Sequence, residues 1–309
     1  MELANLANND NMSPPEIRIA TKSDASHINH LLQTAPYRHL HVDWHLPVDW
    51  IGAKTFLVQT QTEHRSKKLT LTNQLFEPKM DMQACLAITP DPLPAAWVRL
   101  AAVQANHDPQ DVLYKLFAPI LKTLKERGVT EIGWLPIEGW SEQLFFELGF
   151  LQQNEIITYR KADVEIPSTT VREDVVIRPV KIRDMERLAD IEGLAFDPLW
   201  RHSAQTLTTA RSQAFSFDVA VFDEQVVGFQ LSARGRHGAH LARLTVDPHF
   251  HGQGIGSTLL AHAFAGYHKS GLVEVSLNTP ADNIASQILY KKFGFVATQD
   301  IFPVWVMNL

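Results

Sequence analysis

Three glycines at alternate positions, Gly252, Gly254 and Gly256, stand where a phosphate group could be held. They follow an apolar run that ends at Val246, which predicts a strand, and an Asp-Pro pair that would end it. The small and apolar residues after the last glycine predict a helix. A glycine turn at a helix N-terminus presents bare N–H groups to an anion, and the helix dipole adds to the attraction. We therefore expect this glycine turn to bind a phosphate-bearing ligand.

Two familiar phosphate-binding patterns do not fit the glycine turn. A P-loop requires Lys beside Ser or Thr after its last glycine, whereas Gly256 is followed by Ser257 and Thr258. A Rossmann fingerprint has the spacing G-x-G-x-x-G in an early βαβ unit, whereas this pattern is G-x-G-x-G and lies late in the chain. A glycine turn that binds no ligand stays open as an alternative.

A second group of residues lies one expected strand (273–277) beyond the glycine helix. Asn283 is a typical helix N-cap. Tyr290 follows it by about two helical turns and therefore falls on the same side. Gly294 is a typical helix stop, and Phe295 begins a further expected strand. The tyrosine is thus expected on a short helix close to the glycine helix.

The two motifs together resemble those of the GNAT superfamily of CoA-dependent N-acetyltransferases. The first motif is His251-Gly-Gln-Gly-Ile-Gly256 and the second is Asn283-Ile-Ala-Ser-Gln-Ile-Leu-Tyr290. Two positions depart from the family pattern, because His251 replaces Arg or Gln and Ser286 replaces Ala. The resemblance implies acetyl-CoA as the co-substrate, no metal, and two central strands that separate to admit the pantetheine arm. The implied acetyl-CoA-binding residues are Leu244, Thr245, Val246, His251, Gly252, Gln253, Gly254, Ile255, Gly256, Ser257, Asn283 and Ser286.

Acyl transfer to an amine needs a neutral amine, a stabilised oxyanion and a proton for the departing thiolate. The resemblance gives Tyr290 the last role, since a phenol with a pKa near 10 can donate to sulfur. His240 is the candidate base, with a solvent-facing loop histidine as the alternative. A backbone N–H near residues 244–246 could serve the oxyanion. Protonated His251 could pair with phosphate, or the ring could merely face solvent.

The chain contains an internal repeat. Ile17-Arg18 and the capping Asp24 match Ile177-Arg178 and Asp184 at a constant offset of 160. The ends of the two halves match as well, at Gly128 with Gly271 and at two Gly-Phe pairs. Each half is expected to be an α/β unit with a mixed, mostly antiparallel sheet and helices on both faces. The expected parts are a flexible leader (1–16), a degenerate GNAT-like domain (17–165), a linker (166–173) and a GNAT domain with the acetyl-CoA site (174–309).

The N-terminal half has lost the motif residues. The segment aligned with the glycine turn is Asp108-Pro-Gln-Asp-Val-Leu113, which has no glycine. Pro109 removes an N–H donor, and the carboxylates would repel pyrophosphate. Phe145 aligns with Tyr290, and Glu138 aligns with Asn283. We expect this half to be a structural or acceptor-shaping partner.

Acceptor contacts are expected from the loop at 196–202, which carries aromatic and charged residues. Its aromatic side chains could line an acceptor pocket or join the two halves. Arg243 could bind an acceptor carboxylate or lie on the sheet surface. The histidines at 39, 41 and 45 do not have the spacing of a known metal motif, and the charged run 65–68 is most simply a solvated turn.

Composition narrows the function classes. The 309 residues suffice for two domains, and 45% hydrophobic with 20% charged residues is typical of a soluble globular protein. The net charge of −6 argues against nucleic-acid binding and favours a cationic acceptor. The single cysteine, Cys85, excludes internal disulfides and suits a reducing compartment. We expect a cytoplasmic protein without a signal peptide or membrane span, and prefer a monomer.

The sequence thus predicts an N-acetyltransferase with one working site, in its C-terminal half. The amine would attack acetyl-CoA directly in a ternary complex, because no cysteine lies near the motifs to carry the acetyl group. The acceptor would be a small-molecule or peptide amine. Two alternatives remain: a protein N-terminal or lysine acetyltransferase, and a non-catalytic CoA-sensing or scaffold module.

Overall fold

The computed structural model describes residues 13–62, 80–136, 140–168, 171–235 and 238–309. Glu138 and the charged run 65–68 lie outside these residues. Among the described residues, no helix is both long and apolar enough to cross a bilayer.

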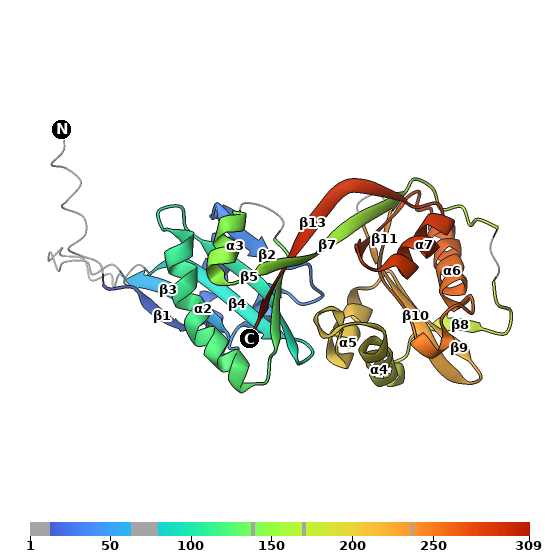
Figure 1. Ribbon diagram of the computed structural model, residues 1–309, viewed down its shortest axis with the longest axis horizontal. Coiled ribbons are helices and arrows are strands. Elements are labelled where there is room, and N and C mark those ends of the chain that lie inside the picture. The colour runs from blue at the N-terminus through green and yellow to red at the C-terminus, as the bar shows by residue number, and fades with distance from the viewer. Residues whose placement is uncertain (1–12, 63–79, 137–139, 169–170, 236–237) are drawn as a thin grey trace, which may run out of the picture.

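Figure 1 shows two lobes joined by two long strands, and each lobe carries strands and helices of one half. The N-terminal half has the strands β1 (Glu16–Ile19), β2 (Tyr37–Leu40), β3 (Phe56–Thr62), β4 (Met80–Pro90), β5 (Ala95–Val103), β6 (Glu131–Trp134) and β7 (Leu151–Lys161). Its helices are α1 (Ala25–Thr34), α2 (Pro109–Glu126) and α3 (Glu142–Leu148).

The C-terminal half follows the same order of elements, except that helix α5 takes the place of strand β2. Its strands are β8 (Val176–Pro179), β9 (Ser216–Phe222), β10 (Gln225–Arg234), β11 (Ala239–Val246), β12 (Val275–Pro280) and β13 (Val296–Asn308). Its helices are α4 (Met185–Ala195), α5 (Ala204–Gln213), α6 (Ile255–Lys269) and α7 (Ile284–Lys292). Short 3-10 turns lie at Pro47–Trp50, Pro198–Trp200 and Pro248–Phe250.

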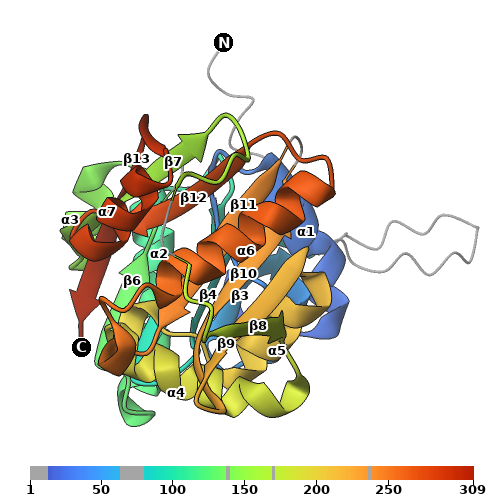
Figure 2. The same cartoon turned by 90° about the vertical axis from the view of Figure 1, so that its right-hand side faces the viewer.

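Helices cover both faces of the sheet in each half, because successive strand residues point to opposite faces. Leu57 of β3 packs in the cluster beneath α2, whereas its neighbour Val58 packs in the cluster beneath α1. In the C-terminal half, Figure 2 shows α6 lying across the strands β9 to β11. Helices α4 and α5 bury their apolar residues in a separate cluster with Phe217 and Phe229. The predicted fold class, mixed and mostly antiparallel with helices on both faces, is confirmed.

The strands form one continuous sheet, in which the halves exchange their last strands. Strand β13 pairs with β6 of the N-terminal half and with β7, while β7 pairs with β12 of the C-terminal half. These are the two long strands that cross between the lobes in Figure 1. The sequence repeat did not indicate this exchange. The boundaries at 165 and 174 stay a prediction.

The repeated motif at the start of each half makes the same contacts twice. Arg18 holds Asp24 with two hydrogen bonds of 2.7 and 2.8 Å, and Arg178 holds Asp184 with bonds of 2.7 and 2.9 Å. Each carboxylate also accepts a backbone N–H from the turn before the helix. The hydrogen bonds from Arg18 lower the pKa of Asp24 to about 2. The repeat is therefore a repeat of structure as well as sequence.

Two neighbouring parallel strands separate in each half. Strands β11 and β12 pair only from Ala239–Leu241 with Val275–Leu277, although both run further. A register shift against β10 at this point leaves Ala242 as a bulge, which bends β11. Strands β5 and β6 pair over three residues in the same way, with a bulge at Arg99. We call these two points the forks of the C-terminal and N-terminal halves.

Candidate functional site

The glycine turn leaves the N-terminus of α6 without a side-chain cap. Gly252 and Gly254 have φ angles of 73° and 84°, a region that suits glycine. Gly254 is the N-cap, and no side chain of the described residues accepts a hydrogen bond from the first turn of the helix. The first backbone N–H groups are therefore available to an anion, which is what a phosphate group requires.

The third glycine has a packing role. A Cβ atom on Gly256 would lie 3.3 Å from Leu289 of α7 and 3.8 Å from Val246 of β11. Gly256 therefore lets α6 approach both elements. Its neighbours Ile255 and Ser257 are buried, so their side chains belong to this packed face.

The side chains of the turn are tied to the protein. His251 donates its Nε2–H to the carbonyl of Val246 over 2.8 Å, so the ring is held at the end of β11. Gln253 accepts a hydrogen bond of 3.1 Å from Arg172. Arg172 also pairs with Asp174. No sequence motif singles out Arg172, which lies in the segment expected to be a linker.

The N-terminal half caps the equivalent helix with its own carboxylate. Asp108 is the N-cap of α2 and accepts the N–H of Gln110 over 3.1 Å, with Pro109 as the first helical residue. The place that an anion would take at this helix is filled by a side chain. This contrast supports the expectation that the N-terminal half does not bind CoA through this helix.

Tyr290 lies in the core beside α6. Asn283 caps α7 by accepting the N–H of Ser286 over 3.2 Å, as its sequence position predicts. The Tyr290 ring packs against Phe295 and Tyr159. Burial raises the pKa of Tyr290 to about 12, although Ser286 acts in the opposite direction. The phenol is therefore neutral at physiological pH and available as a hydrogen-bond donor.

His240 lies within β11, at the fork of the C-terminal half, and not in a loop before it. Its Nδ1 atom is 3.0 Å from the hydroxyl of Ser276 on β12. Burial lowers the pKa of His240 below its usual value of 6.5. The ring is neutral at physiological pH and can accept a proton.

A buried ion pair stands behind the fork. Glu192 of α4 is fully buried and accepts a 2.9 Å hydrogen bond from Arg243. It also accepts the backbone N–H of His202 and the hydroxyl of Thr245. Burial opposes the ionised form of Glu192, but Arg243 and His202 outweigh it and lower its pKa to about 2. Arg243 is therefore held by a partner within its own half, which the sequence did not indicate.

A cavity of about 370 Å³ lies between the two halves, at the fork. His240, Ala242 and Arg243 line it from β11, and the loop 196–202 contributes Leu199 through His202. The C-terminal half also contributes Thr206, Ala233, Asn278 and Pro280. The lining residues of the N-terminal half are His41, Val42, Asp43, Trp44, Asp91, Trp97, Arg99, Leu135 and Ile156. Tyr290 and the glycine turn are not among the residues that line this cavity.

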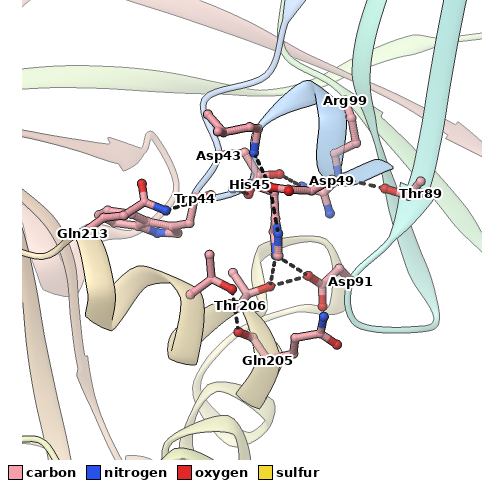
Figure 3. A network of polar contacts seen from close by, with 12 residues as sticks. Asp43, Trp44, His45, Asp49, Thr89, Asp91, Arg99, Gln205, Thr206 and Gln213 are labelled. Atoms are coloured by element: carbon pink, nitrogen blue, oxygen red, sulfur yellow. Dashed lines mark hydrogen bonds and ion pairs between the residues drawn. The ribbon is translucent and has the colours of Figure 1, made fainter. Parts of the chain in front are cut away.

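Polar contacts join the two halves beside the cavity, and Figure 3 shows this network. Thr206 of α5 donates its hydroxyl to Asp91, and His45 lies 3.6 Å from the same carboxylate. Gln213 of α5 donates to the carbonyl of Trp44 over 2.8 Å. On the cavity wall, Arg99 is paired with Asp43 at 2.6 Å. The loop that carries His45 therefore connects the halves.

The described residues contain no group of three or more His, Cys, Asp or Glu side chains placed to hold a metal ion. His39 is buried, and its Nε2 atom lies 3.0 Å from the carbonyl of Val98. His41 stacks on Trp97 with 4.7 Å between ring centroids.

Comparison with known proteins gives one family match. Residues 185–295 match the acetyltransferase (GNAT) family. The [ribosomal protein bS18]-alanine N-acetyltransferase of Escherichia coli (strain K12) is 30% identical over 100 residues, which span 28% of this chain and 68% of that protein.

Two solved structures are similar over nearly the whole chain. A GCN5-related N-acetyltransferase from Sphaerobacter thermophilus has a TM-score of 0.57 with 15% identity and covers 95% of both chains. A tandem GNAT protein from the clavulanic acid biosynthesis pathway has a TM-score of 0.53 with 14% identity, covering 96% of this chain and 98% of the other. At this level of identity the likeness concerns the fold.

Proposed function

Because the chain belongs to the GNAT acetyltransferase family, we propose that its C-terminal half transfers an acetyl group from acetyl-CoA to a primary amine. The observation that carries this proposal is the uncapped N-terminus of α6, set beside a fork that opens next to His240. The N-terminal half has the same fork but a capped helix. One site per chain is therefore proposed.

The described residues suit CoA at both ends of the site. The N–H groups of residues 252–257, with Gln253 and Arg172 beside them, would hold the pyrophosphate. The open edge of β11 at Leu244, Thr245 and Val246 would pair with the pantetheine amides, since β12 has left it. Acetyl-CoA supplies the activated acetyl group as a thioester.

His240 is proposed as the base. The acceptor amine must lose a proton as its nitrogen bonds to the acetyl carbon. A neutral His240 can take that proton on Nε2 when its Nδ1–H donates to Ser276. The lowered pKa of His240 keeps the ring in the accepting form at physiological pH.

Tyr290 is proposed to act on the sulfur that leaves when the carbon–sulfur bond breaks. A thiol has a pKa near 8.5, whereas the pKa of the Tyr290 phenol is about 12. Full proton transfer from the phenol to the thiolate is therefore unfavourable by roughly 3 pKa units. Tyr290 therefore stabilises the thiolate by donating a hydrogen bond, and solvent can supply the proton afterwards.

Direct attack by the amine is proposed in place of a covalent acetyl-enzyme. Cys85 is the only cysteine, and it lies buried in β4 of the N-terminal half. Burial raises its pKa to about 12, so its reactive thiolate form is scarce.

A protein N-terminus is the second candidate acceptor. The similarity to the bS18-alanine N-acetyltransferase favours it, since that protein's name gives an alanine of a ribosomal protein as its target. A lysine side chain would need the same open access. If the protein acetylates no amine, its inferred function is that of a CoA-sensing module without turnover.

Calorimetric titration of the whole protein with acetyl-CoA tests the proposal. We expect one site per chain, followed by acetylation of an amine with release of free CoA. Two sites would show that the N-terminal half also binds. Absence of acetyl-CoA binding would refute the proposed enzymatic function. Binding of acetyl-CoA without acetyl transfer to an amine would favour the sensing module.

A further inference from the structure

We propose that the N-terminal half completes the acceptor site by clamping the loop 196–202 through Trp97, and that the acceptor is a small-molecule amine. This inference rests on the proposed acetyl transfer. It assigns the N-terminal half a direct part in selecting the acceptor, although that half has lost its own anion-binding helix end.

Trp97 holds the loop by its backbone. The indole Nε1–H donates to the carbonyl of Leu199 over 2.7 Å, across the boundary between the halves. Both residues are buried, at 7% and 6% exposure, so no water replaces this bond without an opening of the contact. The loop that shapes the cavity is thus fixed by a residue from the other half.

Leu199 packs closely against residues at the N-terminal fork. A Cβ atom on Gly133 would lie 2.8 Å from the Leu199 Cδ1 atom and 2.8 Å from the Trp97 ring. Only glycine leaves room for both side chains. Leu199 therefore packs over Trp97 and Gly133, the last paired residues of β5 and β6, where the N-terminal fork begins.

The C-terminal half holds the other end of the same loop. Glu192 accepts the backbone N–H of His202, and Arg243 donates to the carbonyl of Trp200. The Trp200 ring lies 5.3 Å from that of Trp97, centroid to centroid. The loop is thereby held between Trp97 on one side and Glu192 on the other, with His240 on the same cavity.

The size and lining of the cavity favour a small acceptor. A volume of about 370 Å³ is in the usual range for small ligands, whereas a protein terminus needs a groove through which the chain can leave. The contacts of Asp91 with Thr206 and of Trp44 with Gln213 hold the two halves together beside the cavity. Aromatic rings from both halves form the apolar walls, and Asp91 offers a carboxylate to a cationic group.

The clamp is tested with Trp97→Phe, which keeps a ring and removes only the N–H donor and some volume. Trp140→Phe is the matched control, because its indole donates to the Arg38 carbonyl over 2.9 Å in the same half, outside the cavity lining. Hydrogen exchange of the whole protein is followed by mass spectrometry over residues 196–203. We expect exchange there to be about tenfold faster in Trp97→Phe than in the control. Equal exchange in the two variants would overturn the clamp.

The acceptor class is tested on wild type and both variants with named probes. These are the free amino acids, putrescine, spermidine, tyramine, glucosamine and a ten-residue peptide that begins with alanine. We expect a small amine to be acetylated, with its KM raised about tenfold in Trp97→Phe and the acetyl-CoA Kd unchanged. Greater kcat/KM for the peptide than for every small amine would overturn the small-acceptor assignment.

The outcomes separate this inference from the proposed function. If wild type binds no acetyl-CoA, the proposed function fails, while the exchange experiment still decides the clamp. Acetyl-CoA binding with acetylation of the peptide, but of no small amine, overturns the acceptor assignment alone. Acetyl-CoA binding without acetylation of any probe counts against the proposed acetyl transfer as well. An unchanged KM in Trp97→Phe, with an active wild type, overturns the role of Trp97 in acceptor binding.

Discussion

His240 and Trp97 occupy equivalent places in the two halves. Each is on the strand that borders a fork, and each lies opposite a small residue of the neighbouring parallel strand, Ser276 and Gly133 respectively. At one fork the residue is a titratable ring beside an open cavity. At the other it is an indole that donates a hydrogen bond to the carbonyl of Leu199. The two halves therefore differ in chemistry at the same point of the same framework.

Replacing His240 by Gln is expected to lower kcat by about 100-fold, since a positioned base contributes roughly that much or more. Acetyl-CoA affinity should not change. In wild type at saturating acceptor, kcat should stay level down to a pH below 6.5, because burial lowers the pKa of His240. The variant should lose that acidic decline. His268→Gln, at an exposed site on α6, is the control, and an unaltered pH profile for the His240 variant would contradict its role as the base.

Tyr290→Phe removes only the phenolic oxygen from a buried ring. We expect kcat to fall by about tenfold or more with an unchanged Kd for acetyl-CoA, because the hydrogen bond to the departing sulfur forms only during the reaction. Tyr159→Phe is the control, since it removes a neighbouring buried phenol that donates to Gln287. Full activity of the Tyr290 variant would leave this tyrosine with a packing role only.

Gly254→Ala should weaken acetyl-CoA binding by about tenfold or more, measured by calorimetry. The added Cβ strains a residue with a φ of 84° and disturbs the N–H groups of the glycine turn. Gly271→Ala is the matched control. It has a φ of 69°, lies just beyond the other end of α6, and has open space around it. If both variants bind acetyl-CoA equally weakly, the cause would be damage to the fold and not loss of the phosphate site.

Glu192→Gln should destabilise the protein by about 3 kcal/mol at pH 7, because it leaves the half-buried Arg243 without its counter-charge. The folded-state pKa of Glu192 is about 2, below its ordinary value of 4.5. Its ionisation therefore stabilises the fold above pH 4.5 and less as the pH falls toward 2. Urea unfolding at pH 7 and pH 3 should show a smaller difference from wild type at the lower pH. Glu186→Gln, exposed on the same helix, should be close to neutral at both.

The sequence was sufficient for the parts of the fold that depend on local patterns. The glycine turn, the Asn283 cap and the repeated Arg–Asp motif are short-range features, and the structure has each of them. The sequence also predicted that the N-terminal half lacks the glycine turn. Asp108 and Pro109, which take its place, are residue types that commonly begin a helix.

The parts that the sequence did not reveal depend on contacts between distant segments. Glu192 looks like an ordinary surface residue of an amphipathic helix, and only the fold places it against Arg243. Trp97 reads as one more apolar strand residue, and its bond to Leu199 joins residues from different halves. His240 was expected ahead of its strand, since the apolar run begins only at Leu241.

The exchange of β7 and β13 also constrains how the chain can fold during synthesis. Strand β6 of the N-terminal half is flanked on one side by β13, which emerges from the ribosome after every other described element. While the C-terminal half is being synthesised, the edge of β6 that later pairs with β13 therefore has no partner from β13. Such edges invite pairing with other chains, and pairing between distant segments is slow. Variants that slow translation or destabilise β13 should therefore aggregate more than wild type during synthesis.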